Sequence, residues 1–169
     1  METKPAMKVR RFQASETATL LSWIDGELNR KIWSGNTFPE EFGKEIFLRH
    51  LTRENLFAFS GFHPTEEFVA YGELVGEKND AGILCRVIVN PAERGQGLGK
   101  TFCTELLRVA FEDFHYRHIT LNAFHFNVPA IRCYKALGFR EVAFRPKARN
   151  YKDQKWDLVI LRKDRPLAT

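Results

Sequence analysis

The sequence lacks long apolar runs and paired cysteines. Across its 169 residues no apolar run reaches the length that spans a membrane, and the segment Met1–Arg11 has no apolar core of the kind that marks a signal peptide. The three cysteines, Cys85, Cys103 and Cys133, are odd in number and contain no Cys-x-x-Cys pair. We therefore expect no membrane partner, no disulfide framework and a cytoplasmic location, with each cysteine acting as a small apolar residue.

A strong excess of one charge is also missing. Lys and Arg number 26 against 21 Asp and Glu, which gives a net charge of +5 that is spread along the chain. Nucleic-acid binders concentrate basic residues on one face, so no nucleic-acid partner is expected. A modest basic excess would still attract an anionic cofactor. The five histidines show no ligand spacing, and we expect no metal site.

What is present suits one compact α/β domain over residues 1–169. The fifteen phenylalanines predict an aromatic interior or cleft. Apolar spacing predicts strands over 8–12, 56–62, 68–75, 82–89, 118–123 and 156–161. It predicts helices from a cap at Ser15 to about 28, over 40–51, from the turn at 94–99 to about 114, and over 127–137, with a loop at 33–39.

A glycine-rich turn connects the strand ending at Val89 to the next helix. Glycines allow close approach of backbone to a ligand, and a helix N-terminus favours anions, so this turn is a candidate phosphate site. A P-loop would need glycine at Arg94, and a dinucleotide fingerprint would need glycine at Lys100, so both patterns fail.

Two segments together indicate a family. The first is Arg-x-x-Gly-x-Gly at Arg94, Gly97 and Gly99, and the second is Asn-x-x-Ala-x-x-x-Tyr-x-x-x-Gly-Phe from Asn127 to Phe139. Both segments resemble those of the GNAT superfamily of N-acetyltransferases, in the same order and with a helix and a strand between them. The stretch 21–35 is similar to the branch that contains ribosomal-protein and spermidine acetyltransferases.

The resemblance implies the GNAT fold, which is mixed α+β. It has a central mixed twisted sheet with helices on both faces, and splayed central strands form the CoA cleft. In that fold backbone N–H groups of the loop bind the pyrophosphate of acetyl-CoA, and the central strand pairs with its pantetheine arm. The positions that match these roles are Arg94, Gly95, Gln96, Gly97, Leu98, Gly99 and Lys100 for the loop, Val87, Ile88 and Val89 for the strand, and Asn127 near the arm. Asn127 could equally be a plain helix cap.

The resemblance also implies the chemistry. Tyr134 matches the family's tyrosine, which would protonate the leaving thiolate, with simple packing as the alternative. Many relatives place a glutamate base where this chain has Asn122. Glu73 is the substitute candidate, with a pKa raised toward neutrality by burial, and a solvent-facing carboxylate is the alternative. His125 and a bound water are further candidates for the base.

The implied function is transfer of acetyl from acetyl-CoA to a primary amine by direct attack in a ternary complex. The acceptor could be a protein N-terminus, a polyamine or another small amine. The alternatives are a CoA-binding regulatory module without catalysis, or a transferase that uses another acyl-CoA. A homodimer is left open.

Overall fold

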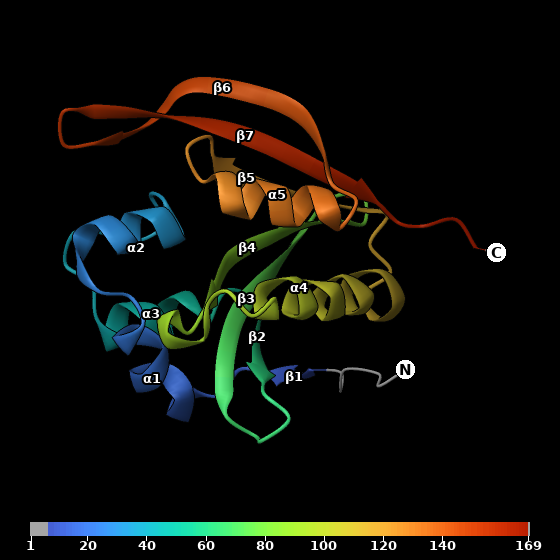
Figure 1. The fold of residues 1–169 in the computed structure, drawn as a ribbon, viewed down its shortest axis with the longest axis horizontal. Coiled ribbons are helices and arrows are strands. Elements are labelled where there is room, and N and C mark those ends of the chain that lie inside the picture. The colour runs from blue at the N-terminus through green and yellow to red at the C-terminus, as the bar shows by residue number, and fades with distance from the viewer. Residues whose placement is uncertain (1–6, 169) are drawn as a thin grey trace.

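A computed structural model describes residues 7–168, so most of the Met1–Arg11 segment, residues 1–6, lies outside the described part. Within residues 7–168 the chain forms seven strands and five α-helices (Figure 1). The strands are β1 (Lys8–Arg11), β2 (Leu56–Phe62), β3 (Phe68–Glu77), β4 (Ala81–Val89), β5 (His118–Phe124), β6 (Arg140–Tyr151) and β7 (Gln154–Asp164). The helices are α1 (Thr17–Ser22), α2 (Gly26–Ser34), α3 (Lys44–His50), α4 (Leu98–Arg108) and α5 (Val128–Ala136). None of these helices combines the length and the apolar character needed to cross a membrane.

The strands form one mixed sheet in the order β1-β2-β3-β4-β5-β7-β6. Every neighbouring pair is antiparallel except β4 and β5, which are parallel. The mixed sheet expected from the sequence is confirmed, with one added strand. The sequence did not predict β6, because this edge strand is exposed over most of its length and shows no clear apolar alternation.

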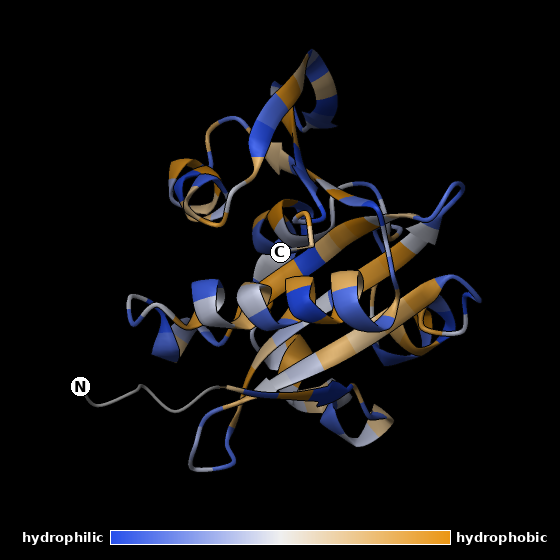
Figure 2. Cartoon of the chain, turned by 90° about the vertical axis from the view of Figure 1, so that its right-hand side faces the viewer, coloured by the Kyte–Doolittle hydropathy of each residue, from blue (hydrophilic) through white to orange (hydrophobic). Residues whose placement is uncertain are grey.

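Apolar cores cover both faces of the sheet. On one face α4 packs Phe102, Leu106 and their neighbours against β3, and α5 adds Ile131. On the other face Leu20 of α1 and Phe47 of α3 pack against Tyr71 of β3. Figure 2 shows the central strands as mainly hydrophobic and the outer faces of the helices as mainly hydrophilic. Helices on both faces are therefore confirmed.

The sheet opens between its two central strands. β4 and β5 pair only at their first residues, with Ala81, Gly82 and Ile83 opposite His118, Ile119 and Thr120. Beyond Ile83 the edge of β4 that faces β5 has no strand partner, while β5 continues to pair with β7 as far as Phe124. The splayed central strands implied by the family resemblance are present.

The helices before β2 differ from the sequence prediction. The single helix expected after Ser15 is two helices, α1 and α2, separated at Trp23–Asp25. Ser15 is not a cap but lies inside a 3₁₀ turn, whose start is closed by a capping box between Gln13 and Glu16. Helix α2 continues through Ser34, where a loop was expected, and ends at Gly35, whose φ is positive. Helix α3 begins only at Lys44, so the helix expected from residue 40 was too long.

Candidate active site

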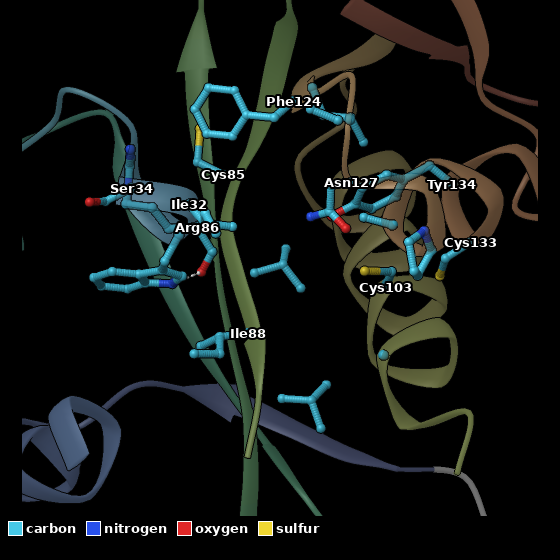
Figure 3. A pocket seen from close by; sticks show the side chains of 18 of the residues that line it. Ile32, Ser34, Cys85, Arg86, Ile88, Cys103, Phe124, Asn127, Cys133 and Tyr134 are labelled. Carbon is cyan, nitrogen blue, oxygen red and sulfur yellow. Dashed lines mark hydrogen bonds between the residues drawn. The ribbon is translucent and has the colours of Figure 1, made fainter. Parts of the chain in front are cut away.

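A cavity of about 1370 Å³ occupies the gap between the splayed strands. Its walls come from β4, from β5, from the glycine-rich loop with the start of α4, and from α5 and α2. In Figure 3 Tyr134, Asn127, Cys103 and Cys133 lie on one side of β4, and Ile32 and Ser34 of α2 lie on the other side. The cavity therefore reaches both faces of the sheet.

The glycine-rich loop presents unpaired donors to this cavity. Gly95 and Gly97 have φ values of +83° and +77°, which non-glycine residues rarely adopt. Gly97 caps α4, and Thr101 is the first residue of that helix whose N–H donates to a backbone carbonyl, at Gly97 (3.1 Å). The preceding N–H groups of the helix start are left for an external acceptor, and the helix dipole adds positive potential there. This is the geometry that binds a phosphate group.

The structure brings most of the predicted site residues to one cavity. Those that line it are Val87, Ile88, Val89, Arg94, Gly95, Gly97, Leu98, Gly99, Lys100, Asn127 and Tyr134. Gln96 does not line the cavity, and its side chain donates to Glu93 (3.2 Å). Glu73 does not line it either. Asn122 does, whereas His125 is exposed and outside it.

Tyr134 and Asn127 both offer unengaged polar atoms. No side chain or backbone group in the described part of the chain hydrogen-bonds to the Tyr134 hydroxyl, and burial raises the pKa of this phenol well above its usual value. The phenol therefore stays protonated at neutral pH and can donate. Asn127 precedes α5, but its side chain makes no capping hydrogen bond. It is thus free to contact a ligand, and the plain-cap alternative is not what the structure has.

The expectation for Glu73 is corrected in two respects. Its side chain is neither facing solvent nor facing the cavity, because it is fully buried beneath α3. Burial pushes the pKa of the carboxyl up, but the hydrogen bond from His50 (3.0 Å) and the positive charge of Arg86 (2.6 Å) push it down, and the net pKa is lowered. Tyr71 donates a further bond (2.7 Å). Glu73 is therefore ionised, and the predicted rise in its pKa is wrong.

Sequence reasoning missed Arg86, which joins this buried network to the cavity. A β-bulge sets Arg86 and Val87 opposite the single residue Gly72, and the φ of Arg86 is +51°. The guanidinium of Arg86 also donates to Thr37 (3.0 Å), and its carbonyl accepts from Trp33 (2.8 Å), the bond drawn in Figure 3. The sequence did contain a signal for Arg86. It is a charged residue inside an apolar strand, and the neighbouring strand carries a glutamate, Glu73.

The cysteines lack the environment of a nucleophile. Burial raises the pKa of Cys85 to about 11, and it raises the pKa values of Cys103 and Cys133 as well. All three remain thiols at neutral pH, although all three line the cavity. Within residues 7–168, no three His, Cys, Asp or Glu side chains gather closely enough to hold a metal ion.

The sequence profile of the Acetyltransferase (GNAT) family matches residues 20–139. The chain belongs to this family. The family, the fold class and the enzyme class predicted from the sequence, an acyl-CoA N-acyltransferase, are thereby confirmed. Its matched region includes the glycine-rich loop, both splayed strands and Tyr134.

Solved structures of several N-acetyltransferases share the fold of this chain. A spermidine N-acetyltransferase from Vibrio cholerae, in complex with CoA and spermine, has a TM-score of 0.81 at 16% identity, over 95% of this chain and 96% of that one. The ribosomal-protein-S18-alanine N-acetyltransferase from Escherichia coli has a TM-score of 0.74 at 18% identity, over 96% of each chain. A ribosomal-protein-alanine N-acetyltransferase from Brucella melitensis has a TM-score of 0.74 at 18% identity, over 93% and 99%.

Proposed function

We propose that this GNAT enzyme transfers the acetyl group of acetyl-CoA to a primary amine, by direct attack of the amine in a ternary complex. The observation that carries the proposal is the β4–β5 gap, because it opens one cavity onto both the glycine-rich loop and Tyr134. The cavity reaches both faces of the sheet, so two substrates could meet in it without exchanging places. The CoA complex of the Vibrio cholerae relative is consistent with this cofactor.

The chain's own groups suit each part of acetyl-CoA. The N–H groups at the start of α4, with Arg94 and Lys100, would hold the pyrophosphate. The unpaired edge of β4 would hydrogen-bond to the amides of the pantetheine arm. Asn90 N–H donates to Val69 on β3 (2.8 Å), so the N–H of the preceding Val89 points to the opposite, unpaired side. There it would donate to the thioester carbonyl oxygen as negative charge develops.

When bound, acetyl-CoA supplies an activated acyl group, and transfer forms a carbon–nitrogen bond as the carbon–sulfur bond breaks. Tyr134 would donate its proton to the departing sulfur. For the proton lost by the amine we propose water in the cavity, because Glu73 lies outside the cavity lining, behind Arg86. Glu73 would then be a positioning residue, which holds Arg86 against the cavity wall.

The test is release of free CoA from acetyl-CoA in the presence of amines and N-terminal peptides. Amine-dependent release, with acetylated product seen by mass spectrometry, is the expected result. Binding of acetyl-CoA without release for any amine would instead favour a CoA-binding regulatory module, and release only with a longer acyl-CoA would favour another acyltransferase. The single domain 1–169, the cytoplasmic location and the lack of metal, nucleic-acid and membrane partners stay predictions.

A further inference from the structure

The charged residues of the cavity fall into two groups. The lining includes five basic and two acidic side chains, which are Arg86, Arg94, Lys100, Arg132 and Arg149, and Asp25 and Glu93. Four of them, Glu93, Arg94, Lys100 and Arg132, lie on the glycine-rich loop, on the 3₁₀ turn just before it, on α4 and on α5, where the anionic cofactor is proposed to bind. The remaining three, Asp25, Arg86 and Arg149, lie on the elements that surround the other end, which is left for the acceptor.

That other end is closed by an aromatic cluster. Phe124 of β5 packs with Trp156 and Leu158 of β7, and Ile32 of α2 packs against them. The long β6–β7 hairpin thereby meets α2, and Figure 1 shows the tip of the hairpin extending over that helix. Arg149 lies on β6 directly opposite Trp156 in the hairpin register. It therefore lines the acceptor end from the hairpin side.

Arg149 has no counter-ion among the described residues. One of its terminal nitrogens donates to the carbonyl of Ala148 (2.8 Å), and among residues 7–168 no carboxylate lies within 4.0 Å of its guanidinium. Arg86 differs, because its charge is balanced by the buried Glu73 at 2.6 Å. A half-buried guanidinium without a counter-ion favours a ligand that brings one, and its planar donors match a carboxylate in bidentate geometry.

We propose that the acceptor is an amine that also carries a carboxylate, and that Arg149 binds this carboxylate. This inference rests on the proposed acetyl transfer and specifies its substrate class. A polyamine would instead need several carboxylates around its ammonium groups. Among the described residues that line the acceptor end, the carboxylate is that of Asp25 alone, which is exposed and precedes α2. With Arg149 on one wall and Asp25 on another, the charges suit a zwitterion such as an amino acid.

The experiment compares amines in pairs that differ only in the anion. Amino carboxylates with different spacings between the two groups are each assayed beside their methyl esters, with spermidine included, in wild-type enzyme and in Arg149→Ala. The acid is expected to have a kcat/KM at least tenfold above that of its ester in the wild type. Arg149→Ala should remove about ten- to a hundredfold of the kcat/KM for the acid and little of that for the ester, chiefly through KM. Because the kcat/KM of each amine is compared between wild type and Arg149→Ala, the intrinsic reactivity of that amine cancels from the ratio.

Two further variants sharpen the result. Arg145→Ala removes an exposed arginine of the same strand that does not line the cavity, and it should leave the preference unchanged. Arg149→Glu should reverse the preference toward esters and polyamines. Better turnover of esters or spermidine in the wild type, or a preference for acids that survives in Arg149→Ala, would overturn the inference while leaving acetyl transfer in place. An enzyme that binds no acetyl-CoA, or that acetylates neither these amines nor N-terminal peptides, would count against the proposed function itself.

Discussion

At the scale of single residues, the Tyr134 hydroxyl is the group that the proposed chemistry depends on most. Tyr134→Phe should lower turnover about a hundredfold or more, because a proton donor to the departing sulfur is lost. The dissociation constant for acetyl-CoA should change by less than about threefold, since the ring still fills its place. Steady-state kinetics and calorimetry measure the two quantities separately.

Tyr116→Phe is the matched control for this variant. Tyr116 is buried, packs in the core against Gly76 and Gly82, and does not line the cavity. Its replacement should leave turnover near the wild-type value. A Tyr134→Phe enzyme that keeps half of the wild-type turnover would show that Tyr134 only packs.

The buried ion pair between Glu73 and Arg86 leads to a prediction about stability. Glu73→Gln leaves Arg86 charged, largely buried and without its counter-ion, so the free energy of unfolding should fall by about 3–5 kcal/mol. The folded pKa of Glu73 lies below its ordinary value of 4.5. Its stabilising contribution is therefore complete above pH 4.5 and is lost as the pH falls toward the folded pKa. Urea unfolding between pH 3 and 7 should show this loss in the wild type and a flatter profile in Glu73→Gln.

The pH profile of turnover separates positioning from catalysis by Glu73. If Glu73 positions Arg86, Glu73→Gln should lose the same fraction of turnover at every pH from about 6 to 9. A loss that recovers at alkaline pH, where more of the substrate amine is already deprotonated, would mean that Glu73 accepts the proton after all. Glu77→Gln, on the same strand but exposed, is the control.

At the scale of elements, the start of α4 depends on a glycine conformation. Gly97→Val places a β-branched residue at φ +77°, which strains the backbone by roughly 1–2 kcal/mol and disturbs the donors of the loop. We expect calorimetry to show at least a tenfold loss of affinity for acetyl-CoA. Gly26→Val is the matched control, because Gly26 also begins a helix, at φ +79°, with open space around a Cβ, and does not line the cavity. Equal affinity for acetyl-CoA in Gly97→Val and Gly26→Val would show that the loop is not part of the cofactor site.

The helices and strands also show which features could be predicted from the sequence. The glycine-rich turn and the segment from Asn127 to Phe139 were placed correctly, since each depends on neighbours close in the chain. The division between α1 and α2 and the bulge at Arg86 were not foreseen. They depend on partners far apart in the sequence, such as Trp33 and Arg86, which are 53 residues apart. The predicted rise in the pKa of Glu73 was wrong for the same reason, because two of its charged or polar partners, His50 and Arg86, come from other elements.

At the scale of the whole molecule, the cavity should handle acetyl-CoA without becoming acylated. Cys85, Cys103 and Cys133 line the cavity, yet burial holds the pKa of each thiol above its usual value, so little thiolate is present at neutral pH. Intact protein incubated with acetyl-CoA alone should keep its mass. An acetyl adduct on one of these thiols would contradict direct attack and indicate a covalent intermediate.

The short pairing of β4 with β5 also divides the sheet into two parts. Strands β1–β4 form one half of the sheet and β5–β7 the other, and only three residue pairs of the sheet connect them. Without a ligand, the amides of Leu84 to Val89 that face the gap should exchange with solvent quickly. A ligand that lies along the gap would supply the missing hydrogen bonds and act as an eighth strand. Its arrival should slow exchange on both sides of the gap, so that the cofactor becomes a structural member of the sheet that holds it.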